Sequence, residues 1–470
     1  MTTSIDMAAC HRMLRALFIA GILLVGISAC GGGGGGGTAE PAAAAAPPPA
    51  PAATAQAAAA TIGQVLEVPD ALSWAPFDVE RRLTVPTGFG IRLLARVPSA
   101  RFMAVAPNGD ILVSVPSAGK IVLLRERPND VPQLFDYATG LRNPHDMVFH
   151  RIGDTTWLYV AESHRVTRSV YASGENSRGD SDVVVADLPD NSTPELQGSY
   201  GHQLKNIALS PDNKLYVSIA STCNACSEDT ESDPVRGAIY QYSADGANRR
   251  LFARGLRNAE GLDFLPGTGT LWVVVNSRDE LRVPFDVDVT GDGASDLGRI
   301  VPTFVDDNPP ELFTPVRDGG HYGWPFCNPA PNATMSSLDL QPDYELNRNS
   351  ARFDCATADR STKGIQAHAA PLGFSFLHDS NLPAAYRKGA AIALHGCWNC
   401  TSLRAGYKVT FFPFDDAGNA GAEIDLVTGF VTNPDTRSVW GRPVDAIADG
   451  KGSLLISDDY AGAIYRLYPR

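Results

Sequence analysis

Charged residues are scarce in this chain of 470 residues, and positive ones most of all. Asp, Glu, Lys and Arg make up 19% of the sequence, and the formal net charge is −13. So acidic a balance argues against nucleic acid or anionic lipid as a partner. It also makes any cluster of cations inside the fold informative, because the background does not supply one.

Several catalytic motifs are absent as well. The sequence has no glycine-rich phosphate-binding loop, no basic helix, and no order of Ser, His and Asp that indicates a triad. Neither of its two Cys-x-x-Cys pairs is followed by His, which disfavours covalently attached haem. Any redox activity of this chain is therefore expected to pass its electrons to a separate acceptor.

The longest apolar run lies near the N-terminus and is short for a membrane span. It covers residues 17–25 and follows a basic start, the pattern of an export signal. Residues 27–30 match a bacterial lipobox, so residues 1–30 are predicted to be a lipoprotein signal with Cys30 lipidated; a plain secretory signal is the alternative. Gly31 after Cys30 is typical of outer-membrane lipoproteins, so we expect an exported, lipid-anchored protein, periplasmic or at the cell surface.

Residues 31–60 contain little besides Gly, Ala and Pro. Such a segment cannot bury apolar surface, so it is predicted to be a disordered tether. The globular part is then residues 61–470, attached to the membrane only through the lipid.

The globular part repeats one pattern, a short strand, a turn rich in Pro, Gly, Asp or Asn, and a stronger strand. The copies begin near residues 102, 146, 207, 262, 372 and 444. Abundant Gly (44) and Pro (34) also favour an all-β fold with many turns. The sequence therefore predicts a six-bladed β-propeller of four-stranded antiparallel blades, with a pair of β-sandwiches or a solenoid as the alternatives.

A propeller brings two sets of loops to one face, those that enter an innermost strand and those that follow a second strand. These loops carry His202, Lys205, Arg257, Asn258, Arg278, Arg404 and Arg442. One histidine with several cations on an acidic protein indicates a pocket for a polyanionic ligand with a general base beside it.

Six cysteines lie outside the signal. By spacing they fall into the pairs Cys223 with Cys226, Cys327 with Cys355, and Cys397 with Cys400. An even number in an exported chain favours disulfides. A zinc site, a redox pair or free thiols stay open for the Cys-x-x-Cys pairs.

Further motifs follow one another along residues 80–470. They are Gly201-His202 before a strand ending in Ser210-Pro211-Asp212, then Gly255-Leu256-Arg257-Asn258, residues 318–325, and Gly441-Arg442-Pro443-Val444-Asp445. In this order they resemble the pyrroloquinoline quinone (PQQ)-dependent soluble glucose dehydrogenases and, more closely, their sorbosone-dehydrogenase-like branch.

The resemblance implies a six-bladed propeller that holds PQQ on a calcium ion at the channel mouth. It implies His202 as the base that takes a proton from a sugar or aldehyde substrate while hydride passes to the quinone, with Arg257 beside the reacting groups. The implied cofactor contacts are Lys205, Arg257, Asn258, Arg404 and Arg442. The implied calcium ligands are the backbone carbonyls of Ser277 and Arg278, which replace a Gly-Pro of the family, and Trp440 replaces a second arginine.

A separate acidic loop spans residues 288–296. Its Asp288, Thr290, Asp292 and Asp296 have the spacing of EF-hand-like calcium loops, in which alternate oxygens surround a glycine-rich bend. A structural calcium site is predicted there, with an acidic surface turn as the alternative.

Two other functions are compatible with the propeller. A metal-dependent lactonase would need inward carboxylates around a catalytic metal, and the cation-rich rim argues against it. A surface binding module that has lost the cofactor is the non-enzymatic alternative, suggested by Arg278 and Trp440.

Overall fold

The computed structural model describes residues 60–378 and 380–470. The predicted signal, its lipidation site Cys30 and the tether up to residue 59 lie outside the described residues. The regular secondary structure of the described chain is mostly β-strand, with one short α-helix, α1 (Pro302–Asp307), and several single-turn 3-10 helices. Among the described residues, no helix has the length and apolar character needed to cross a bilayer.

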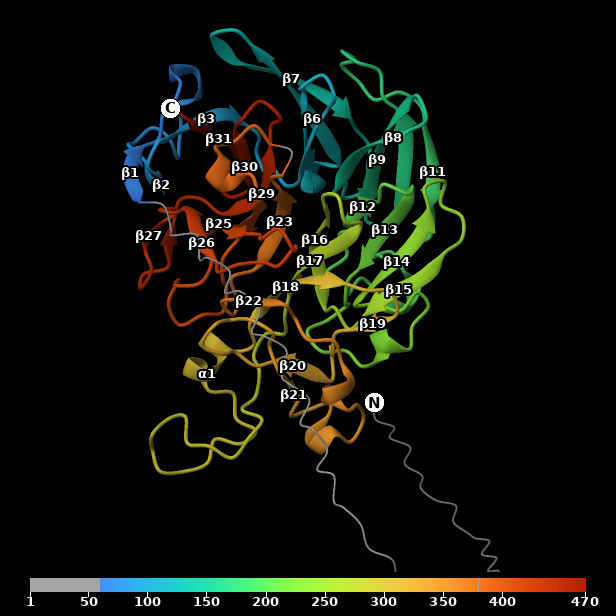
Figure 1. Ribbon diagram of the computed structural model, residues 1–470, viewed down its shortest axis with the longest axis vertical. Helices are drawn as coiled ribbons and strands as arrows, with labels where there is room; N and C mark the ends of the chain where they lie inside the picture. Colours follow the sequence, from blue (N-terminus) through green and yellow to red (C-terminus); the bar gives the residue numbers. More distant parts are fainter. Residues whose placement is uncertain (1–59, 379) are drawn as a thin grey trace, which may run out of the picture. The chain divides into compact units, whose positions relative to one another are not determined.

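Six antiparallel sheets follow one another in chain order (Figure 1). The first contains β4 (Met103–Val105), β5 (Ile111–Val115), β6 (Lys120–Arg127) and β7 (Asp130–Ala138), and the second contains β8 (Met147–Ile152), β9 (Thr155–Glu162), β10 (Arg165–Val170) and β11 (Ser181–Val185). The third contains β12 (Ile207–Leu209), β13 (Lys214–Ile219), β14 (Ala238–Ser243) and β15 (Arg250–Arg254), to which β19 (Gly320–His321) adds in parallel. The fourth contains β16 (Asn258–Leu265), β17 (Thr270–Asn276), β18 (Glu311–Val316) and β22 (Lys363–Ile365), and the fifth contains β23 (Pro371–Phe376), β24 (Gly389–Leu394), β25 (Lys408–Pro413) and β26 (Ile424–Val427).

The sixth sheet joins the two ends of the globular part. Strands β29 (Pro443–Ala448), β30 (Leu454–Asp458) and β31 (Ala463–Pro469) come from the C-terminus, and β3 (Phe89–Arg96) pairs with β31 from the N-terminal side. The first strands of successive sheets contact one another in a closed series, β4, β8, β12, β16, β23, β29 and again β4. The predicted six-bladed propeller is therefore confirmed, and all six sequence copies are the inner strand pairs of its blades.

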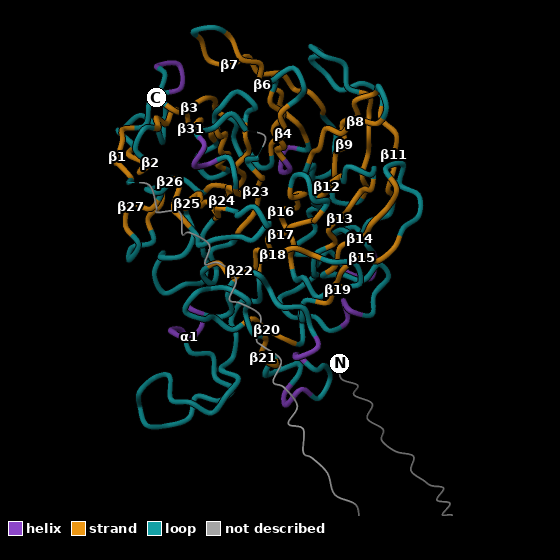
Figure 2. Tube along the Cα trace, viewed as in Figure 1, coloured by secondary structure: helices purple, strands orange, loops and turns teal. Residues whose placement is uncertain are grey.

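Smaller elements decorate this ring. Three two-stranded sheets pair β1 (Thr61–Val65) with β2 (Arg82–Pro86), β20 (Cys327–Pro329) with β21 (Leu340–Pro342), and β27 (Val431–Asn433) with β28 (Ser438–Val439). Figure 2 shows that the long connections on either side of β18 are mostly loop, and they carry α1, β20 and β21. The uneven spacing of the copies thus comes from inserts in the fourth blade.

Buried aspartates link alternate pairs of blades. Their Oδ2 atoms accept a backbone N–H from the inner strand of the next blade, as Asp146 does from Ile207, Asp263 from Phe376 and Asp445 from Met103, each at 2.9 Å. Burial raises the pKa of Asp263 to about 6 and that of Asp445 to about 7. These carboxyls accept hydrogen bonds from N–H groups at strand ends that pairing within the sheet leaves without a partner. They thereby fix neighbouring blades around the channel.

Candidate active site

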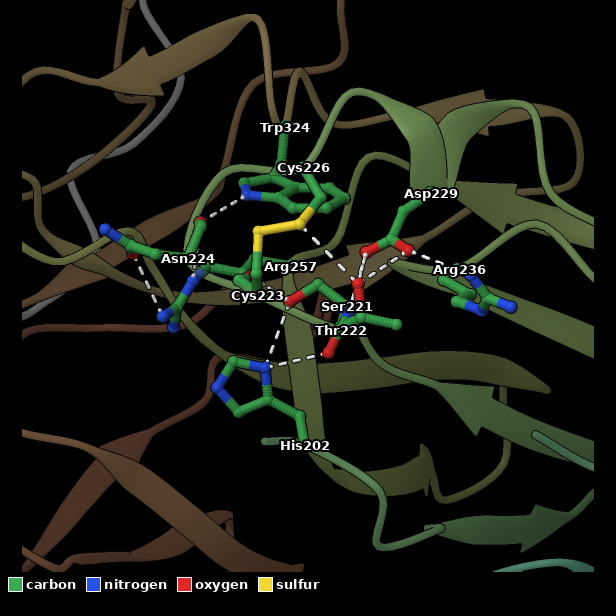
Figure 3. The surroundings of a disulfide bond; sticks show 10 residues. All are labelled: His202, Ser221, Thr222, Cys223, Asn224, Cys226, Asp229, Arg236, Arg257 and Trp324. Atoms are coloured by element: carbon green, nitrogen blue, oxygen red, sulfur yellow. Dashed lines mark hydrogen bonds and ion pairs between the residues drawn. A yellow bond between two sulfur atoms is a disulfide. The ribbon is translucent and has the colours of Figure 1, made fainter. Parts of the chain in front are cut away.

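His202 lies in the loop that enters β12. Its Nδ1 is 2.9 Å from the carbonyl oxygen of Ser221, which can only accept, so Nδ1 carries the proton and Nε2 keeps its lone pair. Figure 3 shows the second ring nitrogen pointing away from these partners. Burial, together with the positive charge of Arg257, lowers the pKa of His202 to about 4. The imidazole is therefore neutral at pH 7 and available as a general base.

Arg257 precedes β16 and is 5% exposed. Its Nε and Nη2 donate to the carbonyl and side-chain oxygens of Asn224, both at 3.1 Å, and Nη2 also lies 3.0 Å from Asp279 Oδ2. Arg257 is thus fixed by the protein itself, and its charge acts on His202 through space.

Asn224 belongs to the loop closed by the Cys223–Cys226 disulfide (Figure 3). Its carbonyl also accepts from Trp324 Nε1 at 3.1 Å, and its amide exchanges hydrogen bonds with the backbone of Asp279. In the same loop, Cys223 accepts a hydrogen bond from the Ser221 hydroxyl, which itself lies 3.0 Å from His202 Nδ1. One small cross-linked loop therefore positions both the histidine and the arginine.

All three predicted cysteine pairs are disulfides. Cys327 is joined to Cys355 in the fourth-blade insert, and Cys397 to Cys400 after β24. Zinc binding and free thiols are therefore excluded for these six cysteines.

Asp279 is the acidic centre of the site, and no sequence motif indicated a role for it. Besides Arg257 it contacts Asn399 Nδ2 at 3.2 Å and His368 Nδ1 at 3.5 Å. Burial opposes ionisation, but the hydrogen bond from His368 and the charge of Arg257 lower the pKa of Asp279. The available signal was its position, directly after a second strand on the functional face.

A second charged group lies across the channel mouth. Arg442 donates from Nε and Nη2 to the carbonyls of His395 (3.0 Å) and Gly396 (2.9 Å). Asp459 bridges His395 Nε2 and Arg101 Nη1, each at 2.9 Å. Arg101 enters the first blade just before β4, and sequence reasoning missed it because that copy was recognised by its strands alone.

Asn258 and Lys205 differ in what they offer. Asn258 Nδ2 donates to Glu260 Oε1 at 3.0 Å, and the other oxygen of this buried glutamate has no partner among the described residues. Lys205 is fully buried, donates to the carbonyls of Pro189 and Gln203, and lies over the ring of Tyr200. Burial lowers the pKa of Lys205 to about 7. Lys205 therefore takes part in the packing and hydrogen bonding of the fold. The structure does not place it with the other cations predicted for the rim.

Arg278 also points away from the rim. Its guanidinium pairs with Asp343 and Glu345 of the insert. Ser277 uses its N–H and hydroxyl for Glu311 and Pro310. The backbone carbonyls of Ser277 and Arg278 accept no hydrogen bond from the described residues.

In the predicted calcium loop at residues 288–296, carboxylate oxygens accept hydrogen bonds from backbone N–H groups of the same loop. Asp288 accepts the N–H groups of Gly291 and Gly293 at 2.6 and 2.7 Å, and Asp296 accepts those of Val289 and Thr290. Asp292 accepts from Ala294. Residues 60–378 and 380–470 contain no group of three or more His, Cys, Asp or Glu that could hold a metal ion. Asp288, Asp292 and Asp296 thus bond backbone donors of their own turn, and the calcium site at Asp288, Thr290, Asp292 and Asp296 stays a prediction.

Residues 83–470 match the sequence profile of the TrAA12-like family. The chain belongs to this family. A protein of uncharacterised function from Borreliella burgdorferi is 25% identical over 420 residues, which is 85% of this chain and 94% of that protein. A pyrroloquinoline quinone-dependent sugar dehydrogenase from Hypocrea jecorina is 26% identical over 302 residues, 57% of this chain and 62% of that protein.

Two solved structures of similar fold agree with this assignment. The holo form of the pyranose dehydrogenase PQQ domain from Coprinopsis cinerea has a TM-score of 0.66 at 18% identity, over 82% of this chain and 97% of that one. The calcium structure of a family AA12 carbohydrate-active enzyme from Trichoderma reesei has a TM-score of 0.64 at 22% identity, over 82% and 96%. At these identities the likeness establishes the propeller.

Proposed function

We propose that this member of the TrAA12-like family is a PQQ-dependent oxidoreductase that oxidises an aldose, a sugar aldehyde or a related alcohol. The observation that carries the proposal is the neutral His202 with Nε2 available, held beside Arg257 by a disulfide-closed loop. The named relatives, which bind PQQ and act on sugars, support the choice of cofactor and substrate class.

PQQ carries three carboxylates. Fewer rim residues are available to bind them than the sequence suggested. Arg404 is exposed and its guanidinium has no partner among the described residues. Arg442 keeps Nη1 without a partner in the same part of the chain. Asn258 and the charge of Arg257 complete the set that would hold the cofactor, and Lys205 is left out. Two available guanidinium groups on an acidic protein still favour a small polyanion.

When bound, PQQ supplies a two-electron quinone that accepts hydride from the substrate carbon. The protein supplies the base: His202 Nε2 accepts the hydroxyl proton as the carbon–oxygen double bond forms. Ser221 holds Nδ1–H and so keeps the ring in the tautomer that this step needs. The negative charge of Asp279 favours the imidazolium that results.

Calcium at the channel mouth is part of the proposal. The unpaired carbonyls of Ser277 and Arg278 are hard oxygen ligands of the kind that calcium takes, and the Arg278 side chain is turned into its ion pairs. Export and lipid anchoring at Cys30 are proposed as well, and three disulfides support an oxidising compartment.

The test uses the purified full-length chain with PQQ and calcium chloride. We expect PQQ binding by calorimetry and reduction of an electron-accepting dye with at least one of a panel of aldoses. His202→Ala should lower kcat by about 10³-fold, the range for removal of a general base. His150→Ala is the matched control, since His150 lies on β8 and contacts Asn213 at the surface.

Absence of PQQ binding would overturn the proposal and favour the surface binding module. Metal-dependent hydrolysis of lactones without dye reduction would favour the lactonase.

A further inference from the structure

A polar cavity lies between α1 and the loop closed by Cys397 and Cys400. Its volume is about 360 Å³. Its polar walls include Thr303, Asp306, Asp307, Gln366, Ser402 and Arg404. No step of the proposed oxidation uses this cavity except through Arg404, which lines it.

Apart from Arg404, which is proposed above to bind the cofactor, the charged walls of the cavity are acidic and do not suit an anion. Asp306 and Asp307 face one guanidinium, that of Arg404, so the walls carry an excess of negative charge. Asp306 is fixed, because it accepts the N–H and hydroxyl of Thr401. Asp307 and Arg404 are exposed, and their side chains have no hydrogen-bond partner among the described residues. Acceptors and donors placed together in this way suit a neutral ligand rich in hydroxyl groups.

The same disulfide loop exposes an aromatic ring. Trp398 is 65% exposed and lies two residues before Cys400, which also lines the cavity. The loop backbone is held by the disulfide and by Arg437, which donates to the carbonyls of Trp398 and Cys400. A large apolar ring that is exposed on a backbone held in this way is available to pack against a ligand at the cavity.

The loop also reaches the candidate active site. Asn399, between Trp398 and Cys400, donates to Asp279, and Asp279 pairs with Arg257. The loop that borders the cavity is therefore joined by hydrogen bonds to the residues around His202.

We propose that this cavity is a subsite for a neutral oligosaccharide, with Asp307 and Gln366 bonding hydroxyl groups and Trp398 packing against a sugar ring. The substrate would then be the end of a short sugar chain, one unit at the reacting site and the next in the cavity. The choice of ligand rests on the proposed oxidation of sugars, whereas the site itself rests on the cavity and its loop.

The test is calorimetric titration of the full-length, PQQ-free protein with cellotriose, maltotriose, xylotriose and glucose. We expect at least one trisaccharide to bind at least tenfold more tightly than glucose. Trp398→Ala should weaken that binding about tenfold, and Asp307→Asn several-fold. Trp74→Ala is the control, because Trp74 is 53% exposed but stacks with Arg96 of β3.

Failure of all three trisaccharides to bind, or equal binding by wild type and both cavity variants, would overturn the subsite. Because PQQ is omitted, this outcome is separate from that of the proposed function. Trisaccharide binding by a protein that binds no PQQ would support the subsite and reject the oxidation.

Discussion

Two Cys-x-x-Cys loops of this propeller have the same length and the same place in their blades, yet they do different work. One follows β13 and the other follows β24, and each is closed by its own disulfide. Both reach Asp279, through Asn224 and Asn399 respectively. The loops differ at both residues between their cysteines, which are Asn224 and Ala225 in one and Trp398 and Asn399 in the other.

These two positions decide which way each loop acts. Asn224 turns inward, and its amide and carbonyl hold Arg257, Asp279 and Trp324 together. Trp398 leaves its ring in solvent, and only its carbonyl is bound, by Arg437. A disulfide between cysteines three residues apart thus makes each loop a rigid support. The side chains between the cysteines decide what the loop does. The loop of residues 223–226, the inner loop, orders reacting groups. The loop of residues 397–400, the outer loop, presents a surface.

The largest expected effect is that of removing the side-chain amide of Asn224. Asn224→Ala removes one hydrogen bond of the buried Arg257 and both bonds between the Asn224 amide and the backbone of Asp279. We expect a loss of about 2 to 4 kcal/mol in the free energy of unfolding and at least a hundredfold fall in kcat/KM. Asn399→Ala, the matched variant of the outer loop, should cost under about 1 kcal/mol. Urea unfolding and steady-state kinetics measure both, and equal losses would contradict the division of roles.

Removal of the cross-links should have the next largest effect. The double variant Cys223→Ser with Cys226→Ser frees the loop that holds Ser221 and Asn224, so we expect kcat to fall by about tenfold or more. The corresponding change at Cys397 and Cys400 should raise KM for sugars and leave kcat within about twofold. Both estimates are based on the loss of rate expected when a catalytic group is misplaced. A fall in kcat confined to the outer pair would reverse the comparison.

The same contrast shows what sequence reasoning can reach. Repeats of period-two hydrophobicity revealed all six blades, because each inner strand pair is coded locally. The cysteine pairs were also readable, since their spacing permits few partners. Which residue between the cysteines turns inward was not readable, because Asn224 is positioned by Arg257 and Asp279, far away along the chain.

Lys205 and the loop at residues 288–296 make contacts that the sequence did not predict. A lysine in a rim loop is expected to face solvent or ligand, yet Lys205 finds carbonyls at Pro189 and Gln203 that no pattern predicts. The spacing of Asp288 and Asp296 matches calcium loops, but the loop's own N–H groups occupy these carboxylates.

Proton binding offers a smaller and more local test. His202 has a pKa lowered to about 4 by burial and by Arg257, so its contribution to stability is complete above its ordinary value of 6.5 and is lost as the pH falls toward 4. In the PQQ-free protein, we expect the NMR titration of its imidazole to have a midpoint near pH 4. Arg257→Gln should move that midpoint toward 6.5, and Trp398→Ala should leave it unchanged. A midpoint near 6.5 in the wild type would remove the electrostatic part of the argument.

The smallest expected effect concerns Arg437, which fixes the outer loop without touching the inner one. Its guanidinium reaches the carbonyls of both Trp398 and Cys400, whereas a lysine ammonium in its place can be a point donor only. Since the disulfide still closes the loop, Arg437→Lys should change the free energy of unfolding by less than about 1 kcal/mol. Trisaccharide affinity should nevertheless fall about threefold, because the Trp398 ring would sample more positions before it packs on a sugar. Affinity unchanged in Arg437→Lys but lost in Trp398→Ala would mean that the ring matters and the rigidity of its loop does not.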